Sequence, residues 1–244
     1  MRKLLLSLFI VLCLATTCFG AWESDGENDY INLSAANTSL QGSTGFTLYI
    51  SFRNVADDTG WVASRWDTGS TSWQSWRISV NDESVTCCVY SSGSKCVGTT
   101  GIDPSDGKLI NLVCHYDGDD LYLYKNGTAD GSVAAADNLS GDQNLAGRLC
   151  TDNDGNNDQK AIIYEVAFWD VNSTMTAADH LALTTGQVRY LPMQFPTGLI
   201  RYYKLDSGEP GTAANGESVY DYTGTYDTTA TNGTWADNNA ISHP

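Results

Sequence analysis

The sequence predicts an antiparallel β-sandwich with one short helix near the end of the domain. Apolar and polar residues alternate with period two over several segments, and Gly, Asn and Asp interrupt these segments at short intervals. Only one stretch has a helical pattern, and the strands lack the helical crossovers that a parallel sheet needs. We therefore expect roughly a dozen short antiparallel strands packed as one domain.

The chain opens with the features of a secretory signal peptide. Basic residues precede an uncharged, Leu-rich stretch over residues 4–14, which is too short to span a membrane. A small-residue pattern ending at Gly20 predicts cleavage there, so that residues 1–20 are removed. The protein is then secreted or held at the cell surface, or periplasmic if the source is a bacterium. Lipid attachment at Cys18 is the alternative.

The charge of the chain narrows the choice of partners. There are 29 Asp or Glu against 13 Lys or Arg, and the formal net charge is -16. Such a surface repels nucleic acid, and no basic run offsets it. Calcium and other divalent cations suit this surface, although acidity also serves simply to keep a secreted protein in solution. No apolar run that could span a membrane follows the leader.

Two segments carry the alternation of half-buried strands most clearly. Residues 46–52 place Phe and aliphatic side chains on one face. Residues 110–116 and 121–124 alternate on either side of a turn at residues 117–118, and an Asn-Gly turn follows at residues 126–127. This second segment predicts a hairpin.

The stretch 162–169 is apolar on both faces, which predicts a strand covered on two sides. Strict alternation divides its residues into one face with Ile162, Tyr164, Val166 and Phe168 and another with Ile163, Glu165, Ala167 and Trp169.

The single helical pattern follows that strand. Thr176 is the expected N-cap and Asp179 its capping-box partner, Leu181 and Leu183 supply the apolar face, and Gly186 ends the helix. We expect one or two turns.

Cleavage of the leader leaves an odd number of cysteines. They are Cys87, Cys88, Cys96, Cys114 and Cys150. Two short strands around a loop at residues 91–93 place Cys88 opposite Cys96, which predicts a disulfide. A second bond between Cys114 and Cys150 is expected on weaker grounds, since sequence does not say whether their strands are neighbours.

Five pieces of the chain, in order, are similar to the laminin G-like, concanavalin A-like jelly-roll domains of lectins and glucanases. They are residues 24–31, 46–52, the pair 63–67 and 76–80, 112–127, and 163–170 with the helical stretch that starts at 175–179 and ends at Gly186. The resemblance implies a jelly roll over residues 21–190. Residues 191–244 are then accessory strands and loops, with a flexible tail over 207–244 as the alternative.

The resemblance also implies a structural calcium ion in some relatives, between the opening segment and the closing strand. Asp25, Asp29 and Glu165 are the candidate ligands here. An exposed Glu165 at the margin of the sheet is the alternative.

A second acidic cluster lies near residue 155. Asp152, Asp154 and Asp158 surround Gly155 with the oxygen density of a calcium loop. The same residue types make a surface turn, which is the competing interpretation.

Tryptophans concentrate in a polar, Gly- and Ser-rich stretch. Trp61, Trp66 and Trp73 are candidates for stacking on sugar rings, with Trp73 the most exposed, whereas Trp76 heads a strand and is expected in the core. They predict a ligand site.

These features favour a secreted, non-catalytic recognition module for a glycan or an extracellular protein surface. A structural or adhesion component of a cell surface or virion appendage is the alternative. Glu23, Asp25 and Glu27 have the spacing of a glycosidase triplet, but Ser24 and Gly26 between them cannot anchor such a strand. We therefore expect no enzymatic activity.

Overall fold

The structure is a computed structural model that describes most of the chain after residue 20. The described residues are 21–33, 44–55, 59–66, 74–81, 84–99, 107–135, 139, 146–152, 155–170, 173–185, 192–205 and 211–236. The predicted leader and the predicted helix end at Gly186 lie outside them.

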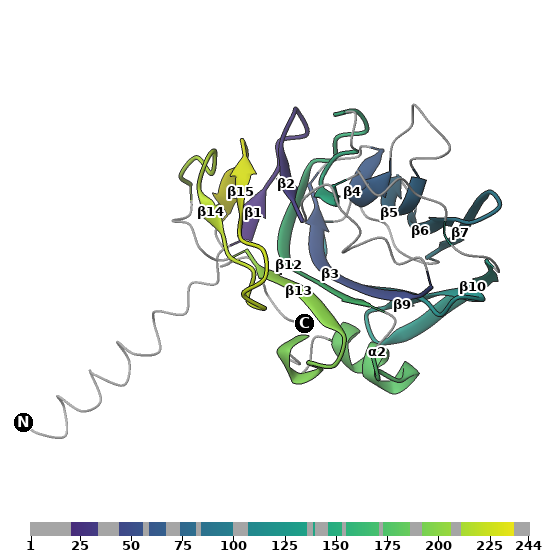
Figure 1. The fold of residues 1–244 in the computed structure, drawn as a ribbon. Coiled ribbons are helices and arrows are strands. Elements are labelled where there is room, and N and C mark those ends of the chain that lie inside the picture. Colours follow the sequence, from purple (N-terminus) through teal and green to yellow (C-terminus); the bar gives the residue numbers. More distant parts are fainter. Residues whose placement is uncertain are drawn as a thin grey trace, which may run out of the picture.

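Two antiparallel sheets are stacked face to face, which confirms the predicted β-sandwich (Figure 1). The first sheet has the order β10 (Thr128–Ala134), β9 (Asp120–Lys125), β8 (Ile110–Tyr116), β3 (Phe46–Asn54), β12 (Ala161–Asp170), β1 (Ala21–Glu23) and β16 (Thr234–Ala236), with β13 (Leu199–Lys204) also paired to β12. The second sheet has the order β14 (Ser218–Val219), β15 (Thr228–Thr231), β2 (Tyr30–Asn32), β11 (Arg148–Leu149), β4 (Gly60–Trp66), β5 (Gln74–Asn81), β6 (Ser84–Tyr90) and β7 (Ser94–Gly98).

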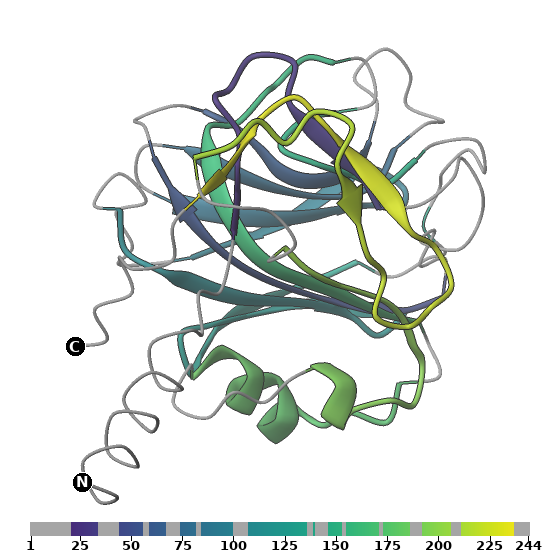
Figure 2. The ribbon, with the colours of Figure 1, turned by 90° about the vertical axis from the view of Figure 1, so that its left-hand side faces the viewer.

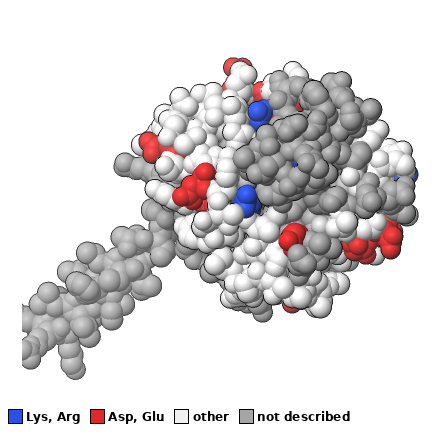
Figure 3. All heavy atoms as spheres, viewed as in Figure 1, with Lys and Arg blue, Asp and Glu red and all other residues white. Residues whose placement is uncertain are grey.

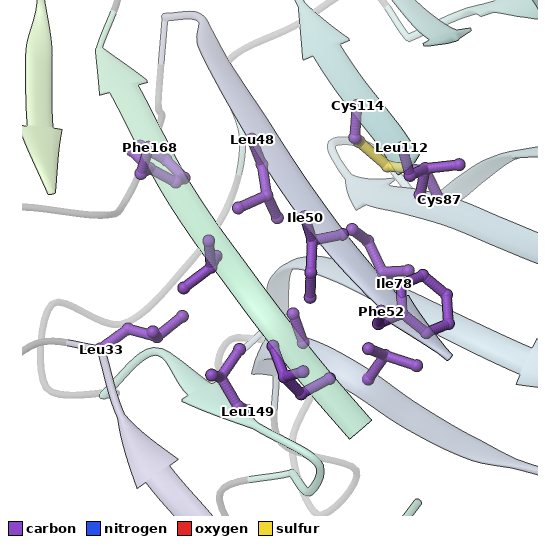
Figure 4. Packing of buried hydrophobic residues seen from close by; sticks show 14 of the residues in the cluster. Leu33, Leu48, Ile50, Phe52, Ile78, Cys87, Leu112, Cys114, Leu149 and Phe168 are labelled. Atoms are coloured by element: carbon purple, nitrogen blue, oxygen red, sulfur yellow. A yellow bond between two sulfur atoms is a disulfide. The ribbon is translucent and has the colours of Figure 1, made fainter. Parts of the chain in front are cut away.

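The core lies between the sheets and receives one face of each. From β3 it takes the predicted residues Phe46, Leu48, Ile50 and Phe52. Figure 4 shows Leu48, Ile50 and Phe52 directed toward Ile78 and Leu149 of the second sheet. Burial of these apolar side chains supplies the main driving force for folding.

Helix α2 (Ala177–Thr184) covers the outer face of the first sheet, and the short 3-10 helix η4 (Pro192–Gln194) lies near it (Figure 2). The predicted capping box is present: the Asp179 backbone N–H donates to the Thr176 hydroxyl, and the Asp179 carboxylate accepts from the Thr176 backbone N–H. Leu183 packs against Trp169 and Val113 of the sheet.

Strand β12 departs from strict alternation, so the predicted division of its two faces is wrong. A bulge lies between Ile163 and Glu165 where β12 pairs with β3. Ile163 therefore joins Val166 and Phe168 in the core, while Tyr164 packs in a separate outer cluster. One extra residue in a strand reverses the side-chain alternation beyond it.

One of the two predicted disulfides is present, and the other is wrong. The expected bond between Cys88 and Cys96 is present across β6 and β7. Cys114 bonds to Cys87 instead of Cys150, because β8 of the first sheet and β6 of the second face each other across the core (Figure 4). Cys150 is a buried free thiol, and burial raises its pKa.

The C-terminal segment 211–236 contributes strands to both sheets. Its anchor is the buried carboxylate of Asp221, which accepts from the backbone N–H groups of Tyr202, Thr223 and Tyr226 at 2.9–3.0 Å. Arg201 lies 3.9 Å from the same carboxylate. Buried charges are tolerated when they are paired and hydrogen-bonded in this way.

Gly233 shows how closely the chain approaches itself before β16. Its φ of 73° is in the left-handed region, and a Cβ there would lie 2.5 Å from Nε1 of Trp22. We expect Gly233→Ala to lower the free energy of unfolding by about 2–3 kcal/mol. Gly216 is the control, because its φ of 79° is similar but a Cβ there meets nothing within 4 Å. Gly216→Ala should cost only about 1 kcal/mol in urea unfolding; equal losses would contradict the steric argument.

Candidate functional site

Trp61 and Trp66 lie together on the outer face of the second sheet, away from the core. They are five residues apart, so a regular strand would point them to opposite faces. A bulge after Trp61 places both Val62 and Ala63 in the core and reverses the alternation. Trp61 and Trp66 thereby share a cluster with Cys88.

Arg77 of β5 lies over both indole rings. Its guanidinium carbon is 4.9 Å from the ring centre of Trp61 and 4.5 Å from that of Trp66, and the two rings meet edge to face. Tyr90 also packs edge-on against Trp66, with 5.8 Å between the two ring centres. We call Trp61, Trp66, Arg77 and Tyr90 the Arg77 cluster.

The tryptophans are less exposed than predicted. Trp61 is 6% exposed and Trp66 is 3% exposed, and Arg77 covers a face of each. The two indole rings therefore have no freely exposed face on which a sugar could stack. Arg77 and Tyr90 are the half-buried members of the cluster, and the two tryptophans are its buried members. Trp73 lies outside the described residues, and Trp76 is in the core as expected.

Arg77 has an unusual environment for a charged side chain. Burial lowers the pKa of its guanidinium, and no neighbouring charge contributes to that shift. Its buried Nε has no hydrogen-bond partner among the described residues. The alternation of side chains along β5 could have predicted Arg77 on the outer face of the second sheet. Trp76, Ile78 and Val80 of the same strand all point into the core.

A pocket of about 450 Å³ lies where the segment after β1 meets β16. It is lined by Glu23, Asp25, Glu27, Asp29, Lys160, Asn232, Gly233 and Thr234. Glu23 ends β1, whereas the other two carboxylates of the triplet follow in the loop. The triplet is thus not carried by one strand, as a glycosidase site of that type requires.

Asp29 is the buried carboxyl of this pocket. Burial raises its pKa to about 6, the backbone N–H of Asp25 opposes that rise, and the nearby Asp25 carboxyl adds to it. The Asp29 carboxylate accepts from the N–H of Asp25 at 2.6 Å and of Gly233 at 3.0 Å. These bonds tie the opening segment to the C-terminal strand.

The structure does not bring Glu165 to Asp25 and Asp29. Glu165 pairs with Ser51 and Lys204 beyond the β12 bulge, whereas the two aspartates line the pocket beside Lys160. In the part of the chain that the structure describes, no three His, Cys, Asp or Glu side chains gather as a metal site. The residues do not fit the predicted shared calcium ion.

The second acidic cluster is organised by hydrogen bonds. The buried Asp152 carboxylate accepts from the Asn156 N–H at 2.7 Å and the Asn157 side-chain amide at 2.9 Å. The Asp158 carboxylate accepts from the Asn28 N–H at 3.0 Å. These contacts are those of a turn. Asp154 lies outside the described residues.

Acidic groups on the face seen in Figure 3 lie apart rather than in one patch. Among the described residues, no helix has the length and apolar character needed to cross a membrane.

Comparisons with known proteins agree with this architecture. The fold is that of the concanavalin A-like sandwiches, and the Laminin_G_3 family profile, described as the concanavalin A-like lectin/glucanases superfamily, matches residues 25–179. The chain belongs to this family. No curated protein sequence is detectably similar to it.

Two solved structures illustrate the fold. A candidate carbohydrate-binding protein from Bacteroides ovatus superposes with a TM-score of 0.65 and 16% identity over 91% of this chain, which spans 61% of that protein. The CBM40 module of a Ruminococcus gnavus IT-sialidase superposes with a TM-score of 0.54 and 11% identity, covering 67% of this chain and 96% of the module.

Proposed function

We propose that this chain is a secreted, non-catalytic module that binds carbohydrate through the Arg77 cluster. The observation that carries the proposal is the half-buried Arg77, whose guanidinium lies over two tryptophans, with the half-buried Tyr90 beside it. Sugar sites combine apolar aromatic surface with a few convergent hydrogen-bond donors. The family and the two structural neighbours support this class of ligand.

The cluster lies on paired strands that a disulfide cross-links. Arg77 lies on β5 directly opposite Cys88 of β6, and the Cys88–Cys96 bond joins β6 to β7. Side chains held on strands in this way need little ordering when a ligand binds, which favours affinity. Two disulfides also support secretion, because such bonds persist in oxidising compartments.

A glycan array with residues 21–244 tests the proposal, followed by calorimetry on the best ligand. We expect saturable binding that Tyr90→Ala weakens about three- to tenfold through loss of aromatic contact. Tyr220→Ala is the matched control, because Tyr220 is 55% exposed beyond β14, at the opposite end of the same sheet.

Absence of specific binding, or equal losses in the two variants, would contradict the proposed site. Appearance of new reducing ends during incubation with the bound glycan would contradict the non-catalytic part. Parallel arrays with calcium and with a chelator test calcium, which stays a prediction.

A further inference from the structure

We infer that the glycan bound by the Arg77 cluster is acidic, and that its carboxylate or sulfate group pairs with Arg77. The inference rests on the proposed function and narrows it to one class of ligand. Its basis is that the described residues around Arg77 supply apolar surface but no anion.

The neighbours of Arg77 in the sheet are uncharged. Its cross-strand partners are Ser64 of β4 and Cys88 of β6. The guanidinium carbon lies over the rings of Trp61 and Trp66, which carry no charge. A guanidinium can form two parallel hydrogen bonds with a planar anion, which aromatic neighbours cannot supply.

Two other arginines that lie over aromatic rings have polar partners in the protein. Arg148 lies over Tyr30 and also donates from Nη1 to the Asp152 carbonyl at 3.0 Å. Arg201 lies over Tyr226 and faces the Asp221 carboxylate at 3.9 Å. The buried Nε of Arg77 has no hydrogen-bond partner among the described residues, and no neighbouring charge shifts its pKa.

This exception is notable in a chain of net charge -16, where acidic partners are abundant. A partly buried cation without a counter-ion loses hydration and gains no pairing in return. A ligand anion would supply that pairing. Exposed carboxylates more than about 8 Å from a bound anion would repel it only weakly, because physiological salt screens such charges.

Matched glycan pairs test the inference by calorimetry. Each pair has an acidic member and the same glycan without the acid: a sialylated oligosaccharide and its desialylated form, a uronic-acid oligosaccharide and its carboxyl-reduced form, and a sulfated oligosaccharide and its desulfated form. Wild-type protein should bind the acidic member of at least one pair about tenfold or more tightly, as expected for a charge-assisted pair. The pair that shows the preference distinguishes carboxylate from sulfate.

Arg77→Gln should bring the two members within about twofold of each other, since it removes the charge and keeps a donor. Arg77→Lys keeps the charge but not the planar edge, and should restore only part of the preference. Arg53→Gln is the control, because Arg53 lies over Tyr164 in the first sheet, remote from the Arg77 cluster. Circular dichroism verifies that each variant is folded.

The outcomes separate the two proposals. Equal wild-type affinity for both members of every pair would overturn the acidic ligand and leave carbohydrate binding intact. Failure to bind any glycan would overturn both. Loss of the preference in Arg53→Gln, or its retention in Arg77→Gln, would overturn the assignment to Arg77.

Discussion

Lowering the pH from 7 to 4 is expected to remove about 3 kcal/mol from the free energy of unfolding through His180 alone. His180 of α2 is 1% exposed, and burial, with His115 next in importance, lowers its pKa to about 3. The unfolded chain binds a proton below about pH 6.5, whereas the folded protein does so only near pH 3. Stability is therefore full above pH 6.5 and is lost progressively as the pH falls toward 3.

The geometry explains why His180 resists protonation. Its ring centre lies 4.5 Å from that of His115 on β8 and 5.1 Å from that of Tyr124 on β9. Both ring nitrogens lack hydrogen-bond partners among the described residues. Burial also lowers the pKa of the neighbouring His115. Protonation of both rings would place two positive charges side by side, which adds to the free-energy cost of protonating His180. Asp179 favours the charged form, but less strongly.

Urea unfolding of wild type and His180→Phe at pH 7, 6, 5 and 4 measures this effect. We expect the stability difference between the two proteins to change by about 3 kcal/mol over this range, in the direction that favours the variant at low pH. Asp29 acts in the opposite direction, because its raised pKa means that stability is gained as the pH falls through about 6. That contribution is common to both proteins and cancels in the difference. A flat difference curve would show that His180 is not the responsible group.

Removal of the Cys87–Cys114 bond is expected to lower the free energy of unfolding by about 3.5 kcal/mol. The bond links residues 27 apart in sequence and joins the two sheets through the core (Figure 4). Its loss restores conformational freedom to the unfolded chain, and the cost grows with the length of the closed loop.

The Cys88–Cys96 bond provides the matched comparison. It links residues only 8 apart on adjacent strands, for which the same relation gives about 2.5 kcal/mol. We expect Cys87→Ala/Cys114→Ala to unfold at lower urea than Cys88→Ala/Cys96→Ala. The reverse order would show that native-state contacts, rather than loop length, determine the contribution of each bond.

The sequence by itself determined the features that depend on neighbouring residues. The alternation over residues 46–52 predicts the inner face of β3, because side chains in a strand point to opposite sides in turn. The Thr176–Asp179 capping box and the hairpin turns of β8, β9 and β10 are likewise local. Cys88 and Cys96 could be paired because one short loop separates their strands.

Only the tertiary structure decided which segments meet across the sandwich. It paired Cys114 with Cys87, separated Glu165 from Asp25, and placed Arg77 over two tryptophans. Alternation says which residues share a face but not what that face packs against, and a bulge reverses the pattern without a clear sign in composition. The tryptophans of the candidate site were predicted from sequence. Their arginine was not, because the contact depends on a bulge in β4 and on the pairing of β4 with β5.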